Sequence, residues 1–506
     1  MDTAVTVVGG GISGLATAYF LREGAAKSGI PLVCTLVEAE SRLGGRVETE
    51  VVDGCVIEAG PDSFLTLKPQ AVDLCEKLGL SELLIGTNSE RSKVYVLVGG
   101  KLRRLPDGLT SVVPRKLTPF LWTGLLTPWG KTRMLLDVLV PRRNDAGDES
   151  LAGFVRRRLG HEALERIAEP LMAGIYAGDA EHLSMSTNFP QLVQLEAKKR
   201  SLVLGTLENS RHPVPGTGRQ VHRPTFMSLR GGLGLMVEAL VSQLNGTQII
   251  TGKKPVALKY AGTLADGRYE LQFDDGTVVR SGSVVLATPA YASAELLKEL
   301  SPEASAILSS IPYVATATVS LIFDRASFPL PLDGSGFVIA PTDNRKITAC
   351  TWVSSKWPTH SPPDRVLLRC FLGRAGHEEI LQRGDDELCQ LAQDELNSIL
   401  GISAVPLQRR LHRCGRSLPQ YNLGHSDKLK ALGEAMASLP GVFLTGAAYR
   451  GVGLPDCIKQ AAITAADVIK FDFGTEAEVQ AVSGPGPTPN GGVASEPGTM
   501  GTGATC

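Results

Sequence analysis

The sequence predicts an α/β fold that combines a parallel sheet, a mixed sheet and a helical insert. Residues 4–8 (AVTVV) are short, β-branched and uncharged, as in a buried strand, and a glycine-rich turn follows them. Residues 12–27 have the pattern of a helix, and residues 32–37 (LVCTLV) form a second buried strand. A strand, a helix and a strand at this spacing make a βαβ unit with parallel strands. The chain is therefore expected to begin with a Rossmann-like unit.

The rest of the chain divides into helical and strand-rich parts. From about residue 66 to 205 the pattern is mostly helical. The turn Asp274-Asp275-Gly276 joins two short apolar runs and is typical of a β-hairpin. Strands are expected over 268–273, 277–280, 284–287, 313–325, 365–372 and 441–446, and a last helix over about 455–470.

These patterns predict several structural units in the 506 residues. The expected units are a discontinuous dinucleotide-binding domain (1–90, 206–300 and 411–473), a helical insert (91–205), a substrate-binding domain (301–410) and a disordered tail (474–506). The tail is expected to be disordered because Gly484–Cys506 holds seven Gly and four Pro and almost no large apolar side chain.

Charge and composition argue against some classes of function. Lys and Arg total 51 and Asp and Glu total 52, a balance that disfavours nucleic-acid binding. The nine cysteines form no CxxC pair and no zinc-type cluster, so no metal site is predicted and a reducing, cytoplasmic compartment is expected. We recognise no signal peptide and no apolar stretch long enough to span a membrane.

The apolar segment 117–130 leaves two interpretations open. It holds Trp122 and Trp129 between basic flanks, so it could insert peripherally into a membrane surface. It could equally form a buried pair of helices. The oligomeric state is also left open.

Gly9-Gly10-Gly11-Ile12-Ser13-Gly14 fits the pattern G-x-G-x-x-G between the first strand and the first helix. Gly9 permits a tight turn, Gly11 lets the backbone approach a pyrophosphate, and Gly14 lets helix and strand pack closely. The N–H groups at the helix N-terminus then face the phosphates. Glu38 ends the second strand, where a carboxylate accepts hydrogen bonds from a ribose diol. Together these features predict a dinucleotide site.

Two further loops suit an extended dinucleotide. Arg42-Leu43-Gly44-Gly45-Arg46 places two glycines and two guanidinium groups next to the phosphate site. Near the other end of the chain, Thr445–Gly453 again joins a strand to a helix through glycines. In its loop 42–49 the sequence resembles the FAD-binding class that contains amine oxidases, phytoene desaturases and porphyrinogen oxidases.

The middle of the chain carries a closer resemblance. Glu58–Phe64, Glu169–Asp179, Leu183-Ser184-Met185 and Tyr449–Gly453 look like the oxygen-dependent protoporphyrinogen and coproporphyrinogen oxidases. Residues 105–143 look most like the bacterial branch that acts on coproporphyrinogen III. The resemblance runs from about residue 5 to 470 and implies FAD held without a covalent bond, since no attachment cysteine is recognised.

The motifs and the resemblance together imply a set of cofactor-binding residues. They are Gly9, Gly11, Ile12, Ser13, Gly14, Glu38, Ala39, Arg42, Gly44, Gly45, Arg46, Gly60, Pro61, Asp62, Ser63, Val256, Gly446, Gly451, Val452 and Gly453. The backbone at Val256 would meet the adenine. Ala447 stands where many relatives have an acidic residue, so any contact there would use backbone N–H.

The resemblance implies fewer substrate contacts. Gly174, expected in a loop, would bring backbone close to the porphyrinogen ring. Several relatives have an arginine near the start of the strand 93–98, but this sequence has Lys93. Lys93 or Arg103 is expected to pair with a propionate, although each is also explained as a solvated surface cation. Arg91, Lys101 and Arg104 remain alternatives. No catalytic side chain is predicted, because the flavin would carry the redox chemistry.

The implied reaction is oxidation of a porphyrinogen to a porphyrin, with O2 as acceptor and H2O2 as product, in haem biosynthesis. The substrate could be coproporphyrinogen III or protoporphyrinogen IX. An amine oxidase or a carotenoid desaturase shares the flavin motifs but is disfavoured by residues 58–64 and 169–179. A nicotinamide dehydrogenase would have no use for the loop 42–49. A prenyl-protein escort on the same fold, which is not an enzyme, would not retain flavin.

Overall fold

The computed structural model describes residues 3–106, 109–110, 112–114, 117–143, 147–211, 224–262 and 267–474. Its first layer is a five-stranded sheet in which all neighbouring strands are parallel. In spatial order the strands are β12 (Gln248–Ile250), β2 (Leu32–Val37), β1 (Thr3–Val8), β16 (Ser283–Leu286) and β22 (Val442–Leu444). The expected α/β class is confirmed. The predicted tail beyond Gly474 lies outside the described residues.

The carboxyl ends of these strands lie in one row. Val8 is level with both Val37 and Leu286, and Leu286 is level with Leu444. The glycine-rich turns that follow β1, β2 and β22 therefore leave the sheet at the same edge. In open parallel sheets this edge is where ligands bind.

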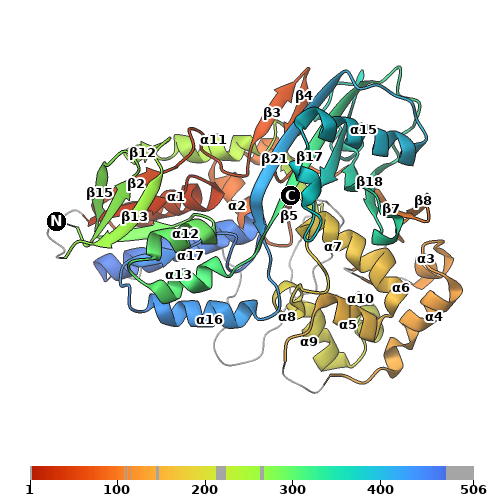
Figure 1. The fold of residues 1–506 in the computed structure, drawn as a ribbon, viewed down its shortest axis with the longest axis horizontal. Coiled ribbons are helices and arrows are strands. Elements are labelled where there is room, and N and C mark those ends of the chain that lie inside the picture. Colours follow the sequence, from red (N-terminus) through yellow and green to blue (C-terminus); the bar gives the residue numbers. More distant parts are fainter. Residues whose placement is uncertain are drawn as a thin grey trace.

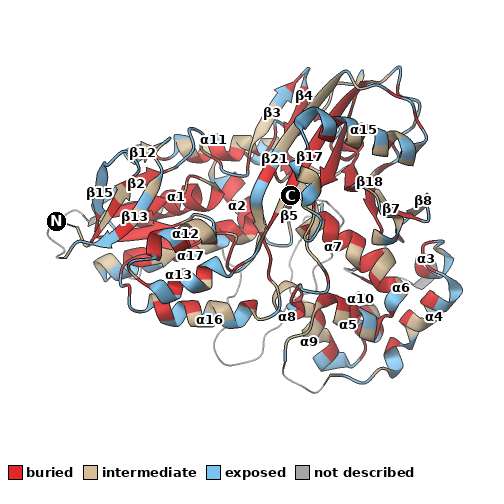
Figure 2. Ribbon diagram, in the orientation of Figure 1, coloured by how far each residue is buried: buried red, intermediate tan, exposed pale blue. Residues whose placement is uncertain are grey.

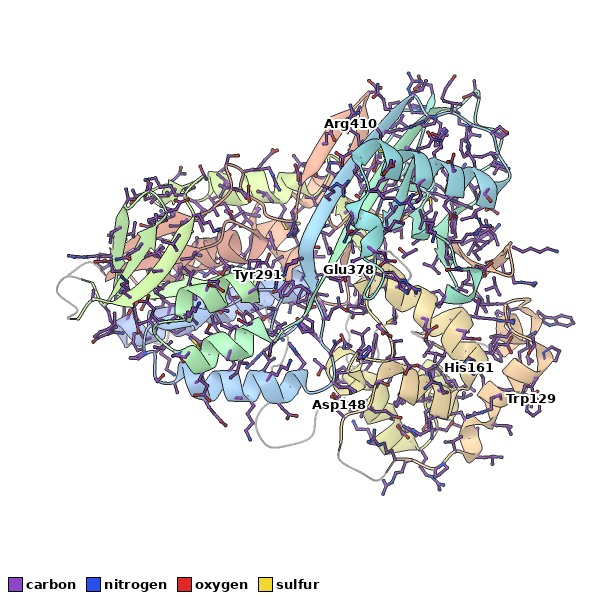
Figure 3. The ribbon with its side chains drawn as sticks, viewed as in Figure 1. Trp129, Asp148, His161, Tyr291, Glu378 and Arg410 are labelled. Carbon is purple, nitrogen blue, oxygen red and sulfur yellow. The ribbon has the colours of Figure 1, made fainter. Side chains whose placement is uncertain are left out.

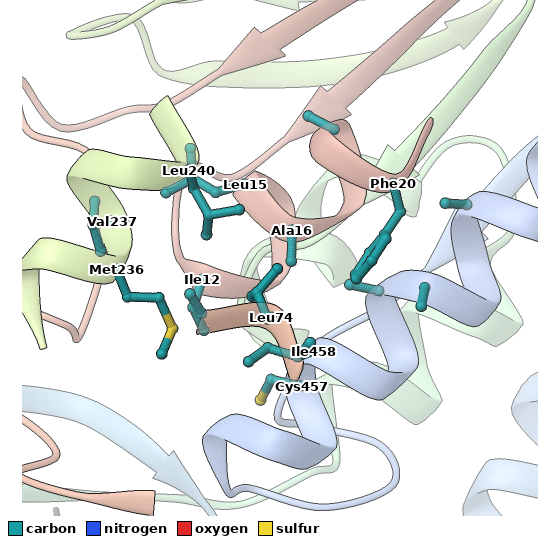
Figure 4. Close-up of a cluster of buried hydrophobic side chains, with 14 of the residues drawn as sticks. Ile12, Leu15, Ala16, Phe20, Leu74, Met236, Val237, Leu240, Cys457 and Ile458 are labelled. Carbon is teal, nitrogen blue, oxygen red and sulfur yellow. The ribbon is translucent and has the colours of Figure 1, made fainter. Parts of the chain in front are cut away.

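Helices cover one face of the parallel sheet (Figure 1). They are α1 (Ile12–Lys27), α2 (Gln70–Lys77), α11 (Gly234–Ser242) and α17 (Leu454–Phe473). Figure 4 shows the apolar cluster between them. The first helix and second strand have the bounds that the sequence predicts. Because α1 lies between the sheet and other helices, it is buried on almost every side, as its run of apolar and small residues requires (Figure 2).

The other face of the parallel sheet is covered by a small antiparallel sheet and three helices. The strands are β13 (Pro255–Tyr260), β14 (Tyr269–Phe273) and β15 (Val278–Ser281), and the helices are α12 (Ala290–Leu297), α13 (Pro302–Ser309) and α16 (His425–Met436). The predicted hairpin around Asp274-Asp275-Gly276 joins β14 to β15. The parallel sheet is thus buried on both faces, which explains its uninterrupted apolar strands.

A seven-stranded mixed sheet forms the second body. Its order is β21 (Gln408–Pro419), β17 (Tyr313–Asp324), β20 (Arg365–Leu372), β19 (Ile347–Thr351), β18 (Gly334–Ile339), β7 (Lys93–Val98) and β8 (Lys101–Arg104). Helix α15 (Asp385–Leu400) packs on one face through a cluster that contains Leu97, Leu368 and Leu388. The other face carries Val96 and Phe371, which pack against the helical part of the chain.

The expected helical insert needs a correction at its start. Residues 93–98, a predicted strand, form β7, and residues 101–104 form β8. Both strands belong to the mixed sheet, because β7 pairs in parallel with β18, so the helical part of the chain does not start at residue 91. The helical block begins at α3 (Leu117–Trp122) and continues through α4 (Pro128–Leu135), α5 (Leu151–Arg158), α6 (His161–Ala163), α7 (Glu169–Tyr176), α8 (Met185–Asn188), α9 (Pro190–Lys199) and α10 (Leu202–Arg211). Inside it, the fully buried Arg158 and Asp137 form an ion pair of 2.6 Å.

Candidate functional site

The turn after β1 has three glycines with different structural roles. Gly9 has a φ of +110°, and a Cβ there would lie 2.9 Å from the carbonyl oxygen of Ala287. A Cβ on Gly14 would lie 1.8 Å from the carbonyl oxygen of Gly9, so α1 could not approach β1. Among the residues that the structure describes, a Cβ on Gly11 would come within 4 Å only of the Cα of Gly45, at 3.8 Å. The fold therefore requires Gly9 and Gly14, whereas the space in front of Gly11 is available to a ligand.

The predicted second loop lies directly against the first. The Gly44 N–H donates to the carbonyl of Gly10 at 2.8 Å, and Gly11 and Gly44 form an isolated parallel bridge. Helix α1 begins behind Gly11 without a side-chain cap and without an acidic residue in its first turn. Its first N–H groups are thus free to bind an anion, as a pyrophosphate site needs.

The two arginines of this loop make contacts within the protein. Arg42 Nη2 donates to the carbonyl of Gly45 at 2.6 Å and lies 3.1 Å from Glu48. Arg46 Nη2 donates to the carbonyl of Gly415 on β21 at 3.0 Å. Arg42 therefore shapes its own loop, and Arg46 connects that loop to the mixed sheet.

Glu38 occupies the end of β2, as the sequence predicts. Its Oε2 accepts from the Gly10 N–H at 2.6 Å, and its Oε1 accepts from the Glu40 N–H at 2.9 Å. The neighbouring Ala39 is exposed. The connection from β12 to β13 passes beside these residues, because the Gly252 N–H donates to the carbonyl of Glu40 at 2.9 Å. That connection leads to Val256, the predicted adenine contact.

The glycine-rich turn after β22 converges on the same place. Gly446 has a φ of +123°, and a Cβ on it would lie 3.7 Å from Ser13 Oγ on α1. Gly453 precedes α17 and supplies no side-chain cap. The Tyr421 hydroxyl accepts from the Gly451 N–H at 2.7 Å and so holds this turn. Two helices with uncapped N-termini thus come from opposite ends of the chain to one edge of the sheet.

The segment around Gly60 continues the site toward the mixed sheet. A Cβ on Gly60 would lie 1.9 Å from the carbonyl oxygen of Arg46, so this glycine allows the segment to touch the phosphate loop. Asp62 is buried and bonds Lys356 Nζ at 2.8 Å and Ser63 Oγ at 2.7 Å. Burial alone would raise the pKa of Asp62, but Lys356 and Arg369 lower it below its ordinary value. This carboxyl is therefore ionised.

Sequence reasoning missed several residues near this segment. Arg369 on β20 is buried, and its Nη2 donates to the carbonyls of Ala59 at 3.0 Å and Gly60 at 2.7 Å. Burial raises the pKa of Glu58 to about 7, even though the Leu233 N–H donates to its carboxylate. The available signal was the charge of Arg369 inside the otherwise apolar run of residues 366–372.

The predicted substrate residues do not come together. Lys93 Nζ lies 2.7 Å from the carboxylate of Asp333, which also accepts from the Tyr95 hydroxyl. Tyr95 packs against the apolar cluster on the sheet face that α15 covers, so Lys93 lies on that face too. Arg103 pairs in register with Val96, which packs with the helical block, and its Nη1 donates to the carbonyl of Gly124 at 2.7 Å. Lys93 and Arg103 therefore lie on opposite faces of the mixed sheet. No pair formed by these two side chains can hold one propionate.

Gly174 needs a correction. It is buried inside α7 and not in a loop, because the helix continues to Tyr176 and ends at Ala177, whose φ is +47°. Helix α7 is the part of the helical block that lies against strands β18 and β19 of the mixed sheet (Figure 1). Any close approach to a ligand at Gly174 would therefore result from its missing side chain and not from an extended backbone.

Known proteins resemble this chain over most of its length. The model of the family of flavin-containing amine oxidoreductases matches residues 12–469. The coproporphyrinogen III oxidase of Bacillus subtilis is 38% identical, with 93% of this chain and 98% of that protein covered. Human protoporphyrinogen oxidase is 31% identical over 94% of this chain and 99% of its own length. A crystal structure from Exiguobacterium sp. 255-15, assigned as a protoporphyrinogen oxidase, has a TM-score of 0.80 and 35% identity and covers 92% of this chain and 99% of its own.

The residues present also fit a flavin dinucleotide. The space in front of Gly11, the uncapped starts of α1 and α17, and the carboxylate of Glu38 form one row at the carboxyl edge of the sheet. This row suits an extended ligand with a pyrophosphate in its middle. The family match indicates a flavin as the cofactor. The chain belongs to the family of flavin-containing amine oxidoreductases.

Proposed function

We propose that this protein is an FAD-dependent oxidase that converts a porphyrinogen to the corresponding porphyrin in haem biosynthesis, with O2 as acceptor and H2O2 as product. The observation that carries the proposal is the 38% identity to a coproporphyrinogen III oxidase over 93% of the chain. Several other relatives, at 31–33% identity, are named coproporphyrinogen III oxidase or protoporphyrinogen oxidase.

FAD would lie along the carboxyl edge of the parallel sheet. The first N–H groups of α1, together with Gly44 and Gly45, would bind the pyrophosphate, and Glu38 would accept from the ribose hydroxyls of the adenosine half. The turn Gly446–Gly453 and the start of α17 would hold the flavin half. When bound, the flavin supplies the chemistry by taking electrons from the porphyrinogen and passing them to O2. The role of this chain's residues is to position the two molecules and exclude water.

FAD would be bound without a covalent link. In the part of the chain that the structure describes, all eight cysteines are buried, and none lies in the loops at 42–49 or 445–453. Denaturing the yellow protein in acid should release the flavin into the supernatant. Flavin that stays with the pellet contradicts this binding mode, and a colourless native protein contradicts the flavin site itself.

Coproporphyrinogen III is proposed as the better substrate. It presents four propionates, and the relatives named coproporphyrinogen III oxidase include the one at 38% identity. Turnover of coproporphyrinogen III and protoporphyrinogen IX should be measured side by side through the fluorescence of the porphyrin products. A higher kcat/KM for coproporphyrinogen III supports the assignment. A higher kcat/KM for protoporphyrinogen IX reverses it, and no turnover of either refutes the proposed reaction.

A peripheral membrane contact of the helical block is also proposed, with the rest of the protein in the cytoplasm. Trp122 is 86% exposed, Trp129 is 74% exposed (Figure 3) and Leu139 is 75% exposed. Lys131 on α4 donates to the carbonyl of Leu121, the neighbour of Trp122, at 2.7 Å. Exposed tryptophans next to a cation favour a lipid interface. None of the helices in the described ranges is long and apolar enough to cross a membrane.

Flotation with vesicles tests this contact. The protein should float with vesicles that contain anionic lipid, and Trp122→Ala combined with Trp129→Ala should abolish flotation. The paired exchange Tyr260→Ala and Val405→Ala, which removes two exposed apolar side chains elsewhere, is the matched control. Equal flotation of both double variants would contradict a role for the helical block.

A further inference from the structure

Two buried cations of the mixed-sheet domain hold one short segment beside the candidate flavin site. Arg369 Nη2 binds the carbonyls of Ala59 and Gly60 at 3.0 and 2.7 Å, and Lys356 Nζ lies 2.8 Å from the carboxylate of Asp62. Both cations are 2% exposed. Removing a charge from water costs considerable free energy unless partners replace the water. Two such cations that bind the same four-residue segment, Ala59–Asp62, therefore indicate a specific role.

This segment is in direct contact with the phosphate loops. Gly60 lies against the carbonyl of Arg46, and a Cβ on Gly45 would lie 3.0 Å from the Cα of Gly11. A single layer of backbone thus separates the Arg369 guanidinium from the loop 44–46. Thr318 Oγ1 on β17 adds a weak contact of 3.5 Å to the carbonyl of Ala59.

Arg369 has donor groups that no described residue accepts from. Its Nε and Nη1 atoms are buried and have no hydrogen-bond partner within the described ranges. The same is true of His412 Nδ1 and Thr316 Oγ1. These atoms lie on one face of the mixed sheet. Thr318 is the register partner of both Phe371 and His412, so the three side chains share a face. Because side chains alternate along a strand, Arg369 and Thr316, each two residues away from one of them, lie on the same face. Buried polar atoms without partners are rare, so their presence on one face indicates a ligand beside it.

The charges around Arg369 do not cancel. Lys356 is balanced by the ionised Asp62, whose pKa it lowers against the effect of burial. Glu58 is a weak counter-charge, because burial raises its pKa to about 7. Burial, followed by the repulsion of Arg369, lowers the pKa of His412, so its ring stays neutral. Asp62 also attracts Arg369, so the two buried cations share one ionised carboxylate and a second carboxyl that ionises only near pH 7. Part of the positive charge beside Arg369 therefore stays unbalanced.

We propose that Arg369 and Lys356 are positioning residues that hold the Ala59–Asp62 segment against the flavin, and that the excess charge of Arg369 stabilises the reduced flavin. The inference rests on the proposed flavin site. Reduction by two electrons and one proton leaves one negative charge on the ring system. A fixed positive charge in a poorly solvated position favours that form and raises the reduction potential.

The midpoint potential of the bound flavin tests the charge. Arg369→Met removes the charge and should shift the reduction equilibrium at least tenfold toward the oxidised form, which is about 30 mV for a two-electron couple. Arg369→Lys keeps the charge and should keep most of the potential. It should weaken flavin binding, because the lysine side chain is one atom shorter and its ammonium does not reach the position from which Arg369 Nη2 donates to both carbonyls. Arg365→Met is the matched control, since Arg365 starts the same strand and bonds Asp364.

Asp62→Asn supplies a test of opposite sign. It removes a buried negative charge, so it should move the potential upward, whereas general loosening of the site would move both variants in the same direction. If Arg369→Met does not fold, Arg369→Lys and Asp62→Asn still test the proposal. A wild-type potential in Arg369→Met, or shifts of equal sign in Arg369→Met and Asp62→Asn, would overturn it.

The outcome does not depend on porphyrinogen turnover, because the potential and the flavin affinity are measured without substrate. If the protein fails to oxidise porphyrinogens but its potential falls in Arg369→Met and rises in Asp62→Asn, the proposed reaction is refuted and the role of Arg369 is supported. A protein that never binds flavin overturns both.

Discussion

Gly11→Val separates the ligand-binding role of the first glycine turn from its structural role. Gly11 has φ −72° and ψ 179°, which any residue adopts, and a Cβ there would meet no protein atom closer than 3.8 Å. The apoprotein should therefore lose only the modest preference of the N-cap position for glycine, about 1 kcal/mol. The two methyl groups of valine would, however, fill the space that a pyrophosphate needs.

The loss of flavin affinity can be worked out from the bonds that become impossible. If two charge-assisted bonds to the pyrophosphate are lost at about 2 kcal/mol each, the Kd rises by roughly 1,000-fold. Gly14→Ala is the contrasting variant. Its Cβ would lie 1.8 Å from the carbonyl of Gly9, so α1 must move, and such overpacking costs about 1–3 kcal/mol.

Two measurements on each variant distinguish these effects. Flavin content is read from the ratio of flavin to protein absorbance, and apoprotein stability from urea unfolding. Gly11→Val should be nearly flavin-free with a nearly unchanged unfolding midpoint, whereas Gly14→Ala should have a lowered midpoint. Full flavin occupancy in Gly11→Val would refute the assignment of this turn as the phosphate site.

Three further predictions concern other parts of the chain. Truncation after Ser483 should leave porphyrinogen turnover unchanged, because the predicted tail lacks apolar surface; a large loss of turnover would show that it acts in the enzyme. If Lys93 or Arg103 pairs with a propionate, its exchange for Met should raise the KM for coproporphyrinogen III more than the KM for protoporphyrinogen IX. Because Lys93 and Arg103 lie on opposite faces of the mixed sheet, only one of the two variants should have this effect. Equal effects of a variant on both substrates would show that its cation does not bind a propionate. Burial raises the pKa of Glu58 in the folded state from 4.5 to about 7, so the folded protein holds this proton more tightly than the unfolded chain. The resulting stabilisation is fully present below pH 4.5 and is lost as the pH rises through 7, which lowers the free energy of unfolding by up to about 3 kcal/mol. Urea unfolding at pH 5 and pH 8 should therefore show a smaller loss for Glu58→Gln than for the wild type, and identical losses would contradict the shift.

The nucleotide-binding half could be predicted because its signals are local. The helix Ile12–Lys27 and the strand Leu32–Val37 have the bounds that the sequence predicts, since each is a run of mainly apolar residues whose ends are marked by glycine, proline or a charged residue. The spacing of Gly9 and Gly14 likewise predicts a turn that only glycine can make, and in the structure a Cβ added at either position would lie less than 3 Å from a backbone oxygen.

The sequence by itself determined the α/β class, the first βαβ unit, the glycine turns and the resemblance that implies their cofactor. Only the tertiary structure decided that β7 joins the mixed sheet through β18, that Lys93 and Arg103 face opposite sides, and that Arg369 binds the carbonyls of Ala59 and Gly60. The reason is physical. Backbone preference and apolar periodicity depend on neighbours in the chain, whereas strand partners and the environment of a buried charge depend on residues far away in sequence. Arg369 is a charged residue in an apolar strand until folding brings Ala59 and Gly60 within hydrogen-bonding distance.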